Sequence, residues 1–411
     1  MPPVCITGSI MKSKFSTLTI AISMIFAGGT AYAVTSATVT QTGTGNTANT
    51  EQSQSTNSTA ITIQSGTSNN AGDASQVTPG GILQKSSNNV LATVIQSGAL
   101  NTANLKQDLS NGVSGAIRQG GQLNTGEVLQ QNAKNASFWG QYYGGDASVN
   151  QYGTNGKALV EQKNTDGTFG YVFQGFGAGN DGSVIQTNSS GGNYGYGYLV
   201  QYGDANKATI TQTDGHQNYG YVIQSGTTNN ASVNQNTSRF TFGGIYQFGI
   251  DNSAKIGQVD AFASSAYVSQ GGARNMGTVN QDNVAYSYAN SYSYGADNQI
   301  TVNQKDGSQL SSFIGQSGNN NDASSVQTGN MNHGSTYQNG SFNKASLTQS
   351  GSFDFSNISQ NGGYNVAAVT QNGLGVSYAQ RNESAIFQNG NNFSATVNQN
   401  GSSLRSTIVQ H

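Results

Sequence analysis

The three histidines of this sequence are the side chains best suited to acid–base catalysis, and they are scattered along the chain. Only His216 has a carboxylate close to it in sequence, Asp214, and no nucleophile recurs beside His216, His333 or His411. Such catalysis needs a nucleophile, a base and an orienting group that converge on one point. The sequence also lacks the G-G-x-G-x-D run of calcium-binding coils. We therefore expect no enzymatic activity, no metal and no cofactor.

Side-chain amides recur at a regular spacing, and their chemistry is hydrogen bonding. The segment from Gln224 to Gln235 has the pattern Q-x-G-x-x-N-x-A-x-V-x-Q, and further copies follow along most of the chain. Because an amide both donates and accepts, identical amides stacked in successive copies form a continuous ladder. We predict two such ladders, one of glutamines and one of asparagines; the alternative is that these are solvated turn residues. The predicted members are Gln96, Gln107, Gln201, Gln212, Gln224, Gln235, Gln338, Gln349, Gln360 and Gln371, and Asn101, Asn206, Asn229, Asn343 and Asn365.

Short strands joined by tight turns would hold these amides in register. Ala231, Val233 and Gln235 occupy alternate positions, and alternate side chains share one face of a strand. The residues between them are mostly polar, which predicts half-buried strands of about five or six residues. We expect the glycine and the asparagine of each Q-x-G-x-x-N segment to supply the unusual backbone angles of the turn. The predicted turn glycines are Gly98, Gly203, Gly226, Gly340 and Gly362.

The spacing of the repeats predicts the fold class. The recurring glutamines are mostly 11 or 12 residues apart, so two strands and two turns make one coil of about 23 residues. We predict an all-β parallel β-solenoid of cross-β type, with two short strands per coil and roughly 16–17 coils. One glutamine is missing between Tyr286 and Tyr294, and the spacing slips near Pro79 and around residues 189–195 and 374–384.

The composition differs from that of an ordinary globular domain. Charged residues make up 8% of the 411 residues, whereas typical globular proteins contain about 25%. Such a composition is also compatible with disorder, but a disordered chain has no reason to keep a constant repeat. The formal net charge is −2, so electrostatics give no reason to expect nucleic acid as a partner.

The first 33 residues have the pattern of a secretory signal peptide. A short basic start at Met11 is followed by a mostly apolar segment, residues 15–26, and by a small-x-small cleavage site that ends at Ala33. We predict translation from Met11, cleavage after Ala33 and a single repeat domain over residues 34–411; the alternative is a buried N-terminal helix. The only cysteine, Cys5, precedes Met11, so we expect no disulfide in the exported chain.

The two types of strand differ on the side that faces away from the amides. In one set the residue before the glutamine is often apolar or aromatic, and in the other set it is usually polar or charged. Because exposed apolar surface favours association, we expect the first set to drive lateral association or attachment to a surface. The predicted contact positions are Ile63, Ile95, Phe173, Ile223, Tyr246 and Tyr337.

The repeats run from Ala37 to Gln410 without polar capping units. Solenoids normally carry such caps, and an open sheet edge recruits another strand. We therefore expect end-to-end polymerisation into a fibre.

The repeat pattern resembles the curlin repeat, and the chain looks like an unusually long member of that family. The resemblance is carried by two half-repeats of Q-x-G-x-x-N-x-A-x-V-x-Q in each coil, over essentially all of residues 37–410, behind a signal peptide. Curlins are subunits of curli, the extracellular functional-amyloid fibres of Gram-negative bacteria. The resemblance implies a secreted fimbrial subunit that polymerises at the cell surface and supports biofilm matrix and adhesion to abiotic or host surfaces. It also implies a nucleator subunit and an outer-membrane secretion pore as partners.

Two other functions are compatible with the same residues. A monomeric β-solenoid would bind a surface as an adhesin, and a nucleator would start such a fibre rather than form its bulk. An ice-binding solenoid would need a flat array of threonines on one face, whereas the outer positions here mix Ser, Thr, Asn, Tyr, Ile and Lys.

Overall fold

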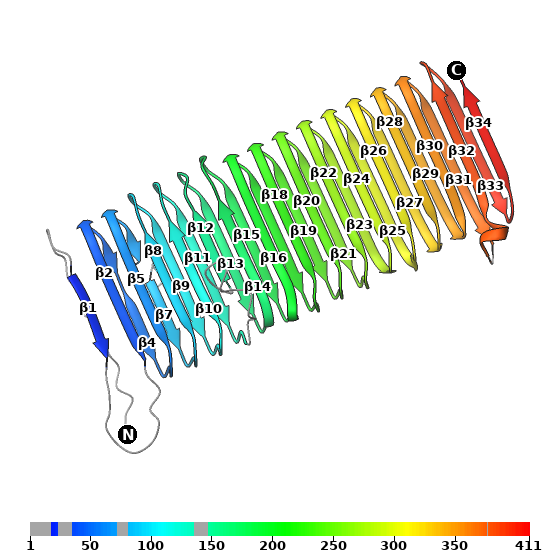
Figure 1. Cartoon of the computed structure of the whole chain (residues 1–411). Coiled ribbons are helices and arrows are strands. Elements are labelled where there is room, and N and C mark those ends of the chain that lie inside the picture. Colours follow the sequence, from blue (N-terminus) through cyan, green and yellow to red (C-terminus); the bar gives the residue numbers. More distant parts are fainter. Residues whose placement is uncertain (1–17, 24–34, 72–80, 135–146, 376) are drawn as a thin grey trace. The chain divides into compact units, whose positions relative to one another are not determined.

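A computed structural model describes residues 18–23, 35–71, 81–134, 147–375 and 377–411. The chain divides into two compact units, Met1–Gln217 and Asn218–His411. In each unit, short parallel strands alternate between two sheets, so that each pass around the coil adds one strand to each sheet (Figure 1). The predicted all-β parallel β-solenoid is confirmed, and the described residues contain no α-helix.

The first unit has two sheets, and its first sheet starts with an antiparallel strand, β1, which pairs with β2. The first sheet contains β1 (Leu18–Ser23), β2 (Ser36–Thr44), β5 (Thr59–Thr67), β8 (Leu91–Gln96), β10 (Ser114–Gln119), β12 (Ala147–Gln151), β14 (Asp166–Gln174) and β16 (Ser190–Asp204). The second sheet contains β3 (Thr47–Ala48), β4 (Thr50–Ser53), β6 (Asn70–Ala71), β7 (Gly81–Lys85), β9 (Thr102–Asp108), β11 (Thr125–Gln131), β13 (Lys157–Lys163), β15 (Asp181–Thr187) and β17 (Lys207–Thr213).

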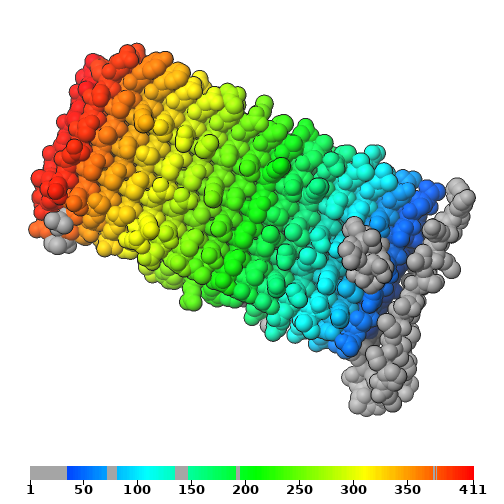
Figure 2. All heavy atoms as spheres, turned by 180° about the vertical axis from the view of Figure 1, so that it is seen from behind, coloured from blue at the N-terminus to red at the C-terminus, as the bar shows by residue number. Residues whose placement is uncertain are grey.

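The second unit repeats this arrangement with longer and more uniform strands. Its first sheet contains β18 (Tyr219–Thr227), β20 (Phe242–Ile250), β22 (Ser265–Ala273), β24 (Tyr288–Ala296), β26 (Ser311–Asn319), β28 (His333–Ser341), β30 (Asp354–Gly363), β32 (Asn382–Asn389) and β34 (Arg405–Gln410). Its second sheet contains β19 (Asn230–Asn236), β21 (Ser253–Val259), β23 (Met276–Ala285), β25 (Gln299–Ser308), β27 (Asp322–Asn330), β29 (Lys344–Ser352), β31 (Val366–Leu374) and β33 (Ser394–Gly401). Successive coils form parallel bands across the visible surface of each unit (Figure 2).

The coils number about 15, fewer than the predicted 16–17, and each contains about 23 residues. Gln76 and Gln141 lie outside the described residues. In the first sheet β5 pairs directly with β8, and β10 pairs directly with β12, so no additional strand of that sheet lies between them. Gln380 lies in a short 3-10 helix, Tyr378–Gln380, where it is exposed, so it does not belong to a strand. The sequence spacing counted each of these three glutamines as a strand, which is half a coil, because it could not distinguish a repeat from an insertion.

Register follows the repeat closely: the glutamine of one coil pairs with the glutamine of the next. In β18 and β20, for example, Gln224 lies opposite Gln247, and Gly226 lies opposite Gly249. A one-residue slip would turn the apolar face outward, so the buried Ala, Val and Ile side chains hold the register. The register shifts where the sequence spacing slips, between β14 and β16, where Asp166 pairs with Ser190 and Thr168 with Gly195.

The core of each unit is a thin layer between the two sheets. Residues of the A-x-V-x-Q type alternate between buried and partly exposed along nearly every strand. A Cβ placed on Gly243 of the first sheet would lie 2.7 Å from Val233 and 3.4 Å from Gln258, both on the second sheet. Each fully buried Val or Ile contributes about 1.5–3 kcal/mol, and the core leaves little room for any larger side chain.

The turn glycines are required both by their backbone angles and by the close approach of neighbouring coils. Gly226 has a φ of +115°, and an added Cβ would overlap the carbonyl oxygen of Gly249 in the next coil. The predicted glycines Gly98, Gly203, Gly226, Gly340 and Gly362 all have positive φ, between +87° and +118°.

The expectation that asparagine supplies an unusual backbone angle is wrong. The left-handed residue is the one before it, for example Thr228 at φ +56° and Leu100 at φ +58°. The asparagine instead closes the turn with its side chain, because Asn101 Nδ2 donates to the carbonyl oxygen of Ser97 at 2.9 Å. Hydrogen bonding of this kind is typical of asparagine in turns.

Candidate functional site

The glutamines lie in two columns per unit, one on each sheet, and are hydrogen-bonded from coil to coil. Gln96 Nε2 donates to Gln119 Oε1 at 2.9 Å, and Gln235 Nε2 donates to Gln258 Oε1 at 2.9 Å. The same nitrogen also donates to a backbone carbonyl, as Gln96 Nε2 does to Asn101 at 3.0 Å. These amides therefore satisfy their donors and acceptor although they are almost fully buried. Each bond runs in the same direction, from Nε2 of one coil to Oε1 of the next coil along the chain.

Every glutamine predicted for the ladder lies in one of these columns and makes at least one such bond. The predicted residues on the first sheets are Gln96, Gln201, Gln224, Gln338 and Gln360. Those on the second sheets are Gln107, Gln212, Gln235, Gln349 and Gln371.

The asparagines form a second column at the corner that follows the first sheet. Asn229 Oδ1 accepts from the backbone N–H and from Nδ2 of Asn252, both at 3.1 Å, and Asn229 Nδ2 donates to the carbonyl oxygen of Gly249 at 2.9 Å. The side chain thus ties its own turn to the turn of the next coil. The predicted residues Asn101, Asn206, Asn229, Asn343 and Asn365 all take part in such bonds.

The opposite corner contains a serine column that the sequence pattern did not reveal. Ser87 Oγ accepts from the backbone N–H of Ser110 at 3.2 Å, and Ser110 Oγ donates to the carbonyl oxygen of Gln130 at 3.1 Å. Serine is common throughout this sequence, so its recurrence three residues after a glutamine, as at Ser87 and Ser110, does not stand out. The recurrence of serine at this position is therefore visible in the sequence only once the position is known.

Asp354 lies at the corner that follows the second sheet, between Asn332 and Asn382 of the neighbouring coils in the second unit. Its backbone N–H donates to Asn332 Oδ1 at 3.0 Å, and its carboxylate accepts from Asn382 Nδ2 at 3.0 Å and from the backbone N–H of Gly373 at 3.1 Å. The residue is fully buried, and burial raises the pKa of its carboxyl group above the ordinary value, while the two accepted hydrogen bonds lower it in part. In the sequence, Asp354 is a single acidic residue among Asn and Ser residues, so the sequence did not predict that it would be buried.

Ser293 interrupts the glutamine column at the position where the sequence lacks a glutamine. It lies opposite Gln270 on one side and Gln316 on the other. Gln270 Nε2, Gln316 Oε1 and the hydroxyls of Ser291 and Ser293 are buried and have no hydrogen-bond partner. Unsatisfied buried polar atoms are costly, so this coil is less strongly bonded to its neighbours than the others.

Ile300 replaces a glycine beside this interruption and restores the packing. In the preceding coil a Cβ on Gly277 would lie 2.8 Å from Val268 and 3.2 Å from Gln270 Nε2. One coil later these three positions are occupied by Ser291, Ser293 and Ile300. The two sets of side chains contain the same number of heavy atoms, so the core stays filled while the amide bonds are lost.

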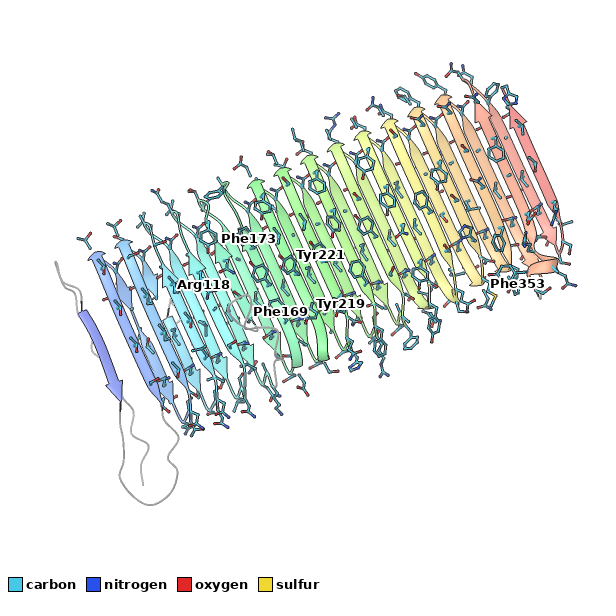
Figure 3. All side chains as sticks on the ribbon, in the orientation of Figure 1. Arg118, Phe169, Phe173, Tyr219, Tyr221 and Phe353 are labelled. Atoms are coloured by element: carbon cyan, nitrogen blue, oxygen red, sulfur yellow. The ribbon has the colours of Figure 1, made fainter. Side chains whose placement is uncertain are left out.

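The outward face of the first sheet carries the apolar positions predicted for lateral contact. Of these, Ile63 is 39% exposed and Tyr337 is 48% exposed, and the other four side chains are partly exposed. Figure 3 shows Phe169 and Phe173 on β14 of the first unit and Tyr221 on β18 of the second. The structure does not show a second molecule, so lateral contact stays a prediction.

Aromatic rings form a continuous row on this face in the second unit, which we call the aromatic row. One ring comes from each of six successive strands of the first sheet, and neighbouring ring centroids lie 4.9–5.5 Å apart. The rings alternate between the position three residues before the glutamine and the position one residue before it. The members are Tyr221, Tyr246, Tyr267, Tyr292, Phe313 and Tyr337.

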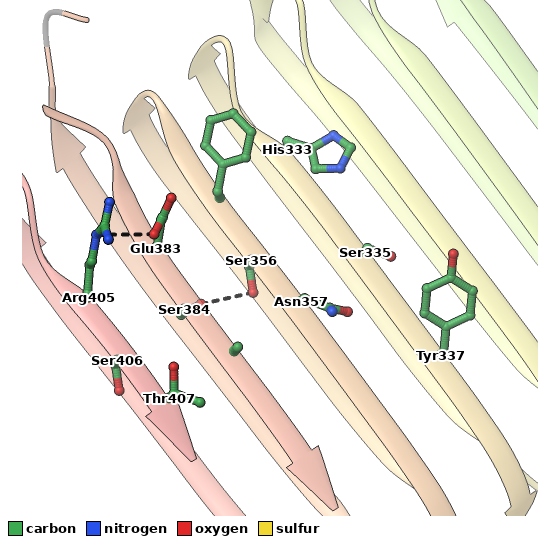
Figure 4. A pocket seen from close by; sticks show the side chains of 12 residues that line it. His333, Ser335, Tyr337, Ser356, Asn357, Glu383, Ser384, Arg405, Ser406 and Thr407 are labelled. Atoms are coloured by element: carbon green, nitrogen blue, oxygen red, sulfur yellow. Dashed lines mark hydrogen bonds and ion pairs between the residues drawn. The ribbon is translucent and has the colours of Figure 1, made fainter. Parts of the chain in front are cut away.

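A groove of about 620 Å³ begins where the aromatic row ends (Figure 4). Beyond Tyr337 the central positions of the face are small, with Asn357 and Ala385 on its floor. Glu383 lies at its rim and pairs with Arg405 at 3.2 Å and with Arg381. These charges neutralise one another in part, and His333, Ser356 and Ser384 also line the groove.

Each of the three histidines has a different environment. His216 Nδ1 lies 2.8 Å from Ser190 Oγ, while Asp214 accepts from Asn188 Nδ2 at 2.9 Å. His333 is on the outward face of β28, and His411 follows β34. Within the described residues, no group of three or more His, Cys, Asp or Glu side chains is placed to hold a metal ion. Nor does any helix in that part of the chain have the length and apolar character needed to cross a membrane.

No protein-family model matches this chain, and no curated protein matches it. The resemblance to the curlin repeat therefore depends on the repeat pattern alone.

Proposed function

We propose that this protein is a secreted structural subunit that self-assembles into extracellular, curli-like amyloid fibres for adhesion and biofilm matrix. The observation that carries the proposal is the equivalence of the coils. Most coils present to the next the same parallel backbone edge, the same glutamine amides and the same corner asparagines. A surface that already binds its own copy within the chain has the chemistry to bind the same surface of a second molecule.

The other parts of the proposal follow from the sequence. The predicted signal peptide supports export, and the curlin resemblance supports a Gram-negative cell surface, a nucleator subunit and an outer-membrane secretion pore. The low charge of the chain, 8% of residues, supports close stacking, because few like charges meet from coil to coil. The proposed role is structural, without catalysis, metal or cofactor.

Seeded assembly tests the proposal directly. Residues 34–411 would be purified in denaturant, diluted, and followed by thioflavin fluorescence, and the product would be examined by fibre X-ray diffraction. We expect sigmoidal growth that seeds shorten, with reflections near ~4.8 Å and ~10 Å. A folded β-protein that stays monomeric for days would contradict the proposal and favour the monomeric adhesin.

Seeding also addresses the second candidate, a nucleator. A nucleator would shorten the lag phase of another subunit at low molar ratio and elongate poorly by itself. A main subunit would elongate from its own seeds until the monomer is consumed.

A further inference from the structure

The face that carries the aromatic row is uncharged over six strands. β18, β20, β22, β24, β26 and β28 contain no Asp, Glu, Lys or Arg, and His333 at the start of β28 is their only histidine. Burial raises the pKa of Tyr267 above its ordinary value, so this phenol stays neutral at physiological pH. The second sheet of the same unit differs, since its outer positions include Lys255 and the pair Lys305–Asp282. A charged polymer or an anionic membrane would find no counter-charge on the aromatic face.

The rings of the row lie across the sheet rather than standing upright from it. A Cβ on Gly315 would lie 3.3 Å from the Phe313 ring and 3.4 Å from the Tyr337 ring, and a Cβ on Gly244 would lie 3.3 Å from the Tyr267 ring. The rings therefore cover the small residues beside them, and five of the six are only partly exposed. Neighbouring ring planes are inclined to one another by 33–45°, so the row is a continuous strip in which each ring offers its own partly exposed face.

This shape favours one kind of partner over another. Two copies of one sheet pack tightly when side chains of each interdigitate with gaps in the other, and the covered glycines remove such gaps here. A neutral polysaccharide has the opposite requirement, because the C–H faces of its sugar rings pack flat on aromatic rings while its hydroxyls bond to polar groups at the edges. Tyrosine hydroxyls and the partly exposed Asn290 supply such groups.

The spacing of the row also fits a polymer. Successive rings come from adjacent paired strands, so the row advances by ~4.8 Å per ring along the axis of the unit, which is close to the length of one hexose in an extended β-1,4-linked chain. Successive sugars would therefore meet successive rings, and contacts that are individually weak would add along the row.

We propose that the aromatic row of the second unit binds a neutral, extended β-linked polysaccharide lying along the solenoid axis of that unit. The inference rests on the proposed function, because a subunit of a biofilm matrix would meet such a polysaccharide outside the cell. A folded monomer already carries the complete row, so polysaccharide binding and polymerisation can fail separately.

The test measures depletion of the full chain from solution by insoluble β-1,4-glucan powder, with competition by a soluble β-1,4-linked hexose oligosaccharide. The main variant is Tyr246→Ser/Tyr292→Ser/Tyr337→Ser, which interrupts the row at every second ring. We expect its apparent affinity to fall by roughly tenfold or more, equivalent to the loss of a few weak contacts. The matched control is Phe262→Ser/Phe342→Ser/Tyr364→Ser, which removes three exposed rings at the corners, and it should bind as the unaltered chain does.

A second variant keeps the test decisive if the serine variant folds poorly. Tyr246→Leu/Tyr292→Leu/Tyr337→Leu preserves apolar area but removes the flat rings, so it should lose polysaccharide binding and keep its β-sheet circular dichroism. Absence of binding by the unaltered chain would overturn the inference, as would equal binding by all variants. Loss of self-association in the serine variant, without any polysaccharide binding by the unaltered chain, would assign the row to a second copy and also overturn it. Thioflavin assembly, followed in parallel, tests the proposed fibre independently.

Discussion

At the scale of single residues, Asp354 combines a buried position with a charge that has no cationic partner among the groups bonded to it. The corner column supplies its hydrogen bonds, but an asparagine there would both donate and accept, whereas a carboxylate only accepts. Because burial raises the pKa of Asp354, the folded state binds its proton more tightly than the unfolded chain. The stability it contributes is therefore full below the ordinary pKa of 3.8 and is lost as pH rises through the higher folded value.

We predict that Asp354→Asn stabilises the second unit near neutral pH. The amide carries no charge and matches Asn332 and Asn382, the bonded residues of the neighbouring coils, so the free energy of unfolding should rise by roughly 1–3 kcal/mol. The gain should disappear at a pH well below 3.8, where the carboxyl is protonated in both states. Urea unfolding of monomeric protein at the two pH values measures this effect. Asp306→Asn, at an exposed turn bonded to Asn283, is the control, and equal effects of the two substitutions would contradict the explanation.

At the scale of the structural element, the turn after the first sheet is limited by the distance between coils. Gly226 combines a positive φ with a direct approach to Gly249, whereas Gly112 has a φ of +66° and open space around its Cβ position. The two glycines therefore separate the cost of backbone angle from the cost of overlap.

We predict that Gly226→Ala destabilises the second unit by more than Gly112→Ala destabilises the first. The second substitution adds only the cost of a left-handed alanine, about 1–2 kcal/mol. The first adds an overlap with the next coil, which neighbouring backbones must move to relieve. Denaturant midpoints of the two variants, each compared with the unaltered chain, provide the measurement. Similar losses would mean that the coils separate without significant strain.

At the scale of the whole molecule, a solenoid is a linear array in which each coil contacts only its neighbours. Stability is then nearly a sum of local terms, and a weak interface opens before the rest. In the second unit we expect the interface around Ser293 to open first, because Gln270 and Gln316 lack their amide partners there.

We predict that amides of β24 exchange with solvent faster than those of β20 and β22. The variant Ser291→Val/Ser293→Gln/Ile300→Gly rebuilds the pattern of the preceding coil and should slow this exchange by restoring two amide bonds, worth roughly 1–3 kcal/mol together. Ser293→Gln alone should destabilise, since Ile300 occupies the room that the amide needs. Hydrogen exchange followed by mass spectrometry is measured on the unaltered chain and on both variants. Uniform protection across β20–β26 in the unaltered chain would contradict the prediction.

The sequence by itself determined the class of the fold, the phase of the strands and the identity of the ladder residues. A period of 11 or 12 residues with alternating Ala, Val and Gln allows few arrangements, because stacked identical coils satisfy every buried amide at once. The same regularity placed the turn glycines, since each recurs at a fixed distance from a glutamine. These features are local, or are repeated often enough to be read without knowing the contacts.

Only the tertiary structure decided features that depend on side chains from different coils. The compensation between Ser293 and Ile300 joins positions on facing sheets, and the burial of Asp354 depends on the strands around it. The aromatic row is equally hidden in the sequence, because its rings come from six strands and become neighbours only when the coils stack. The coil number also needed the strand pairing, since spacing alone does not distinguish an insertion from a repeat. Repetition along the chain predicts what every coil shares, whereas the contacts between coils decide where one coil differs from the next.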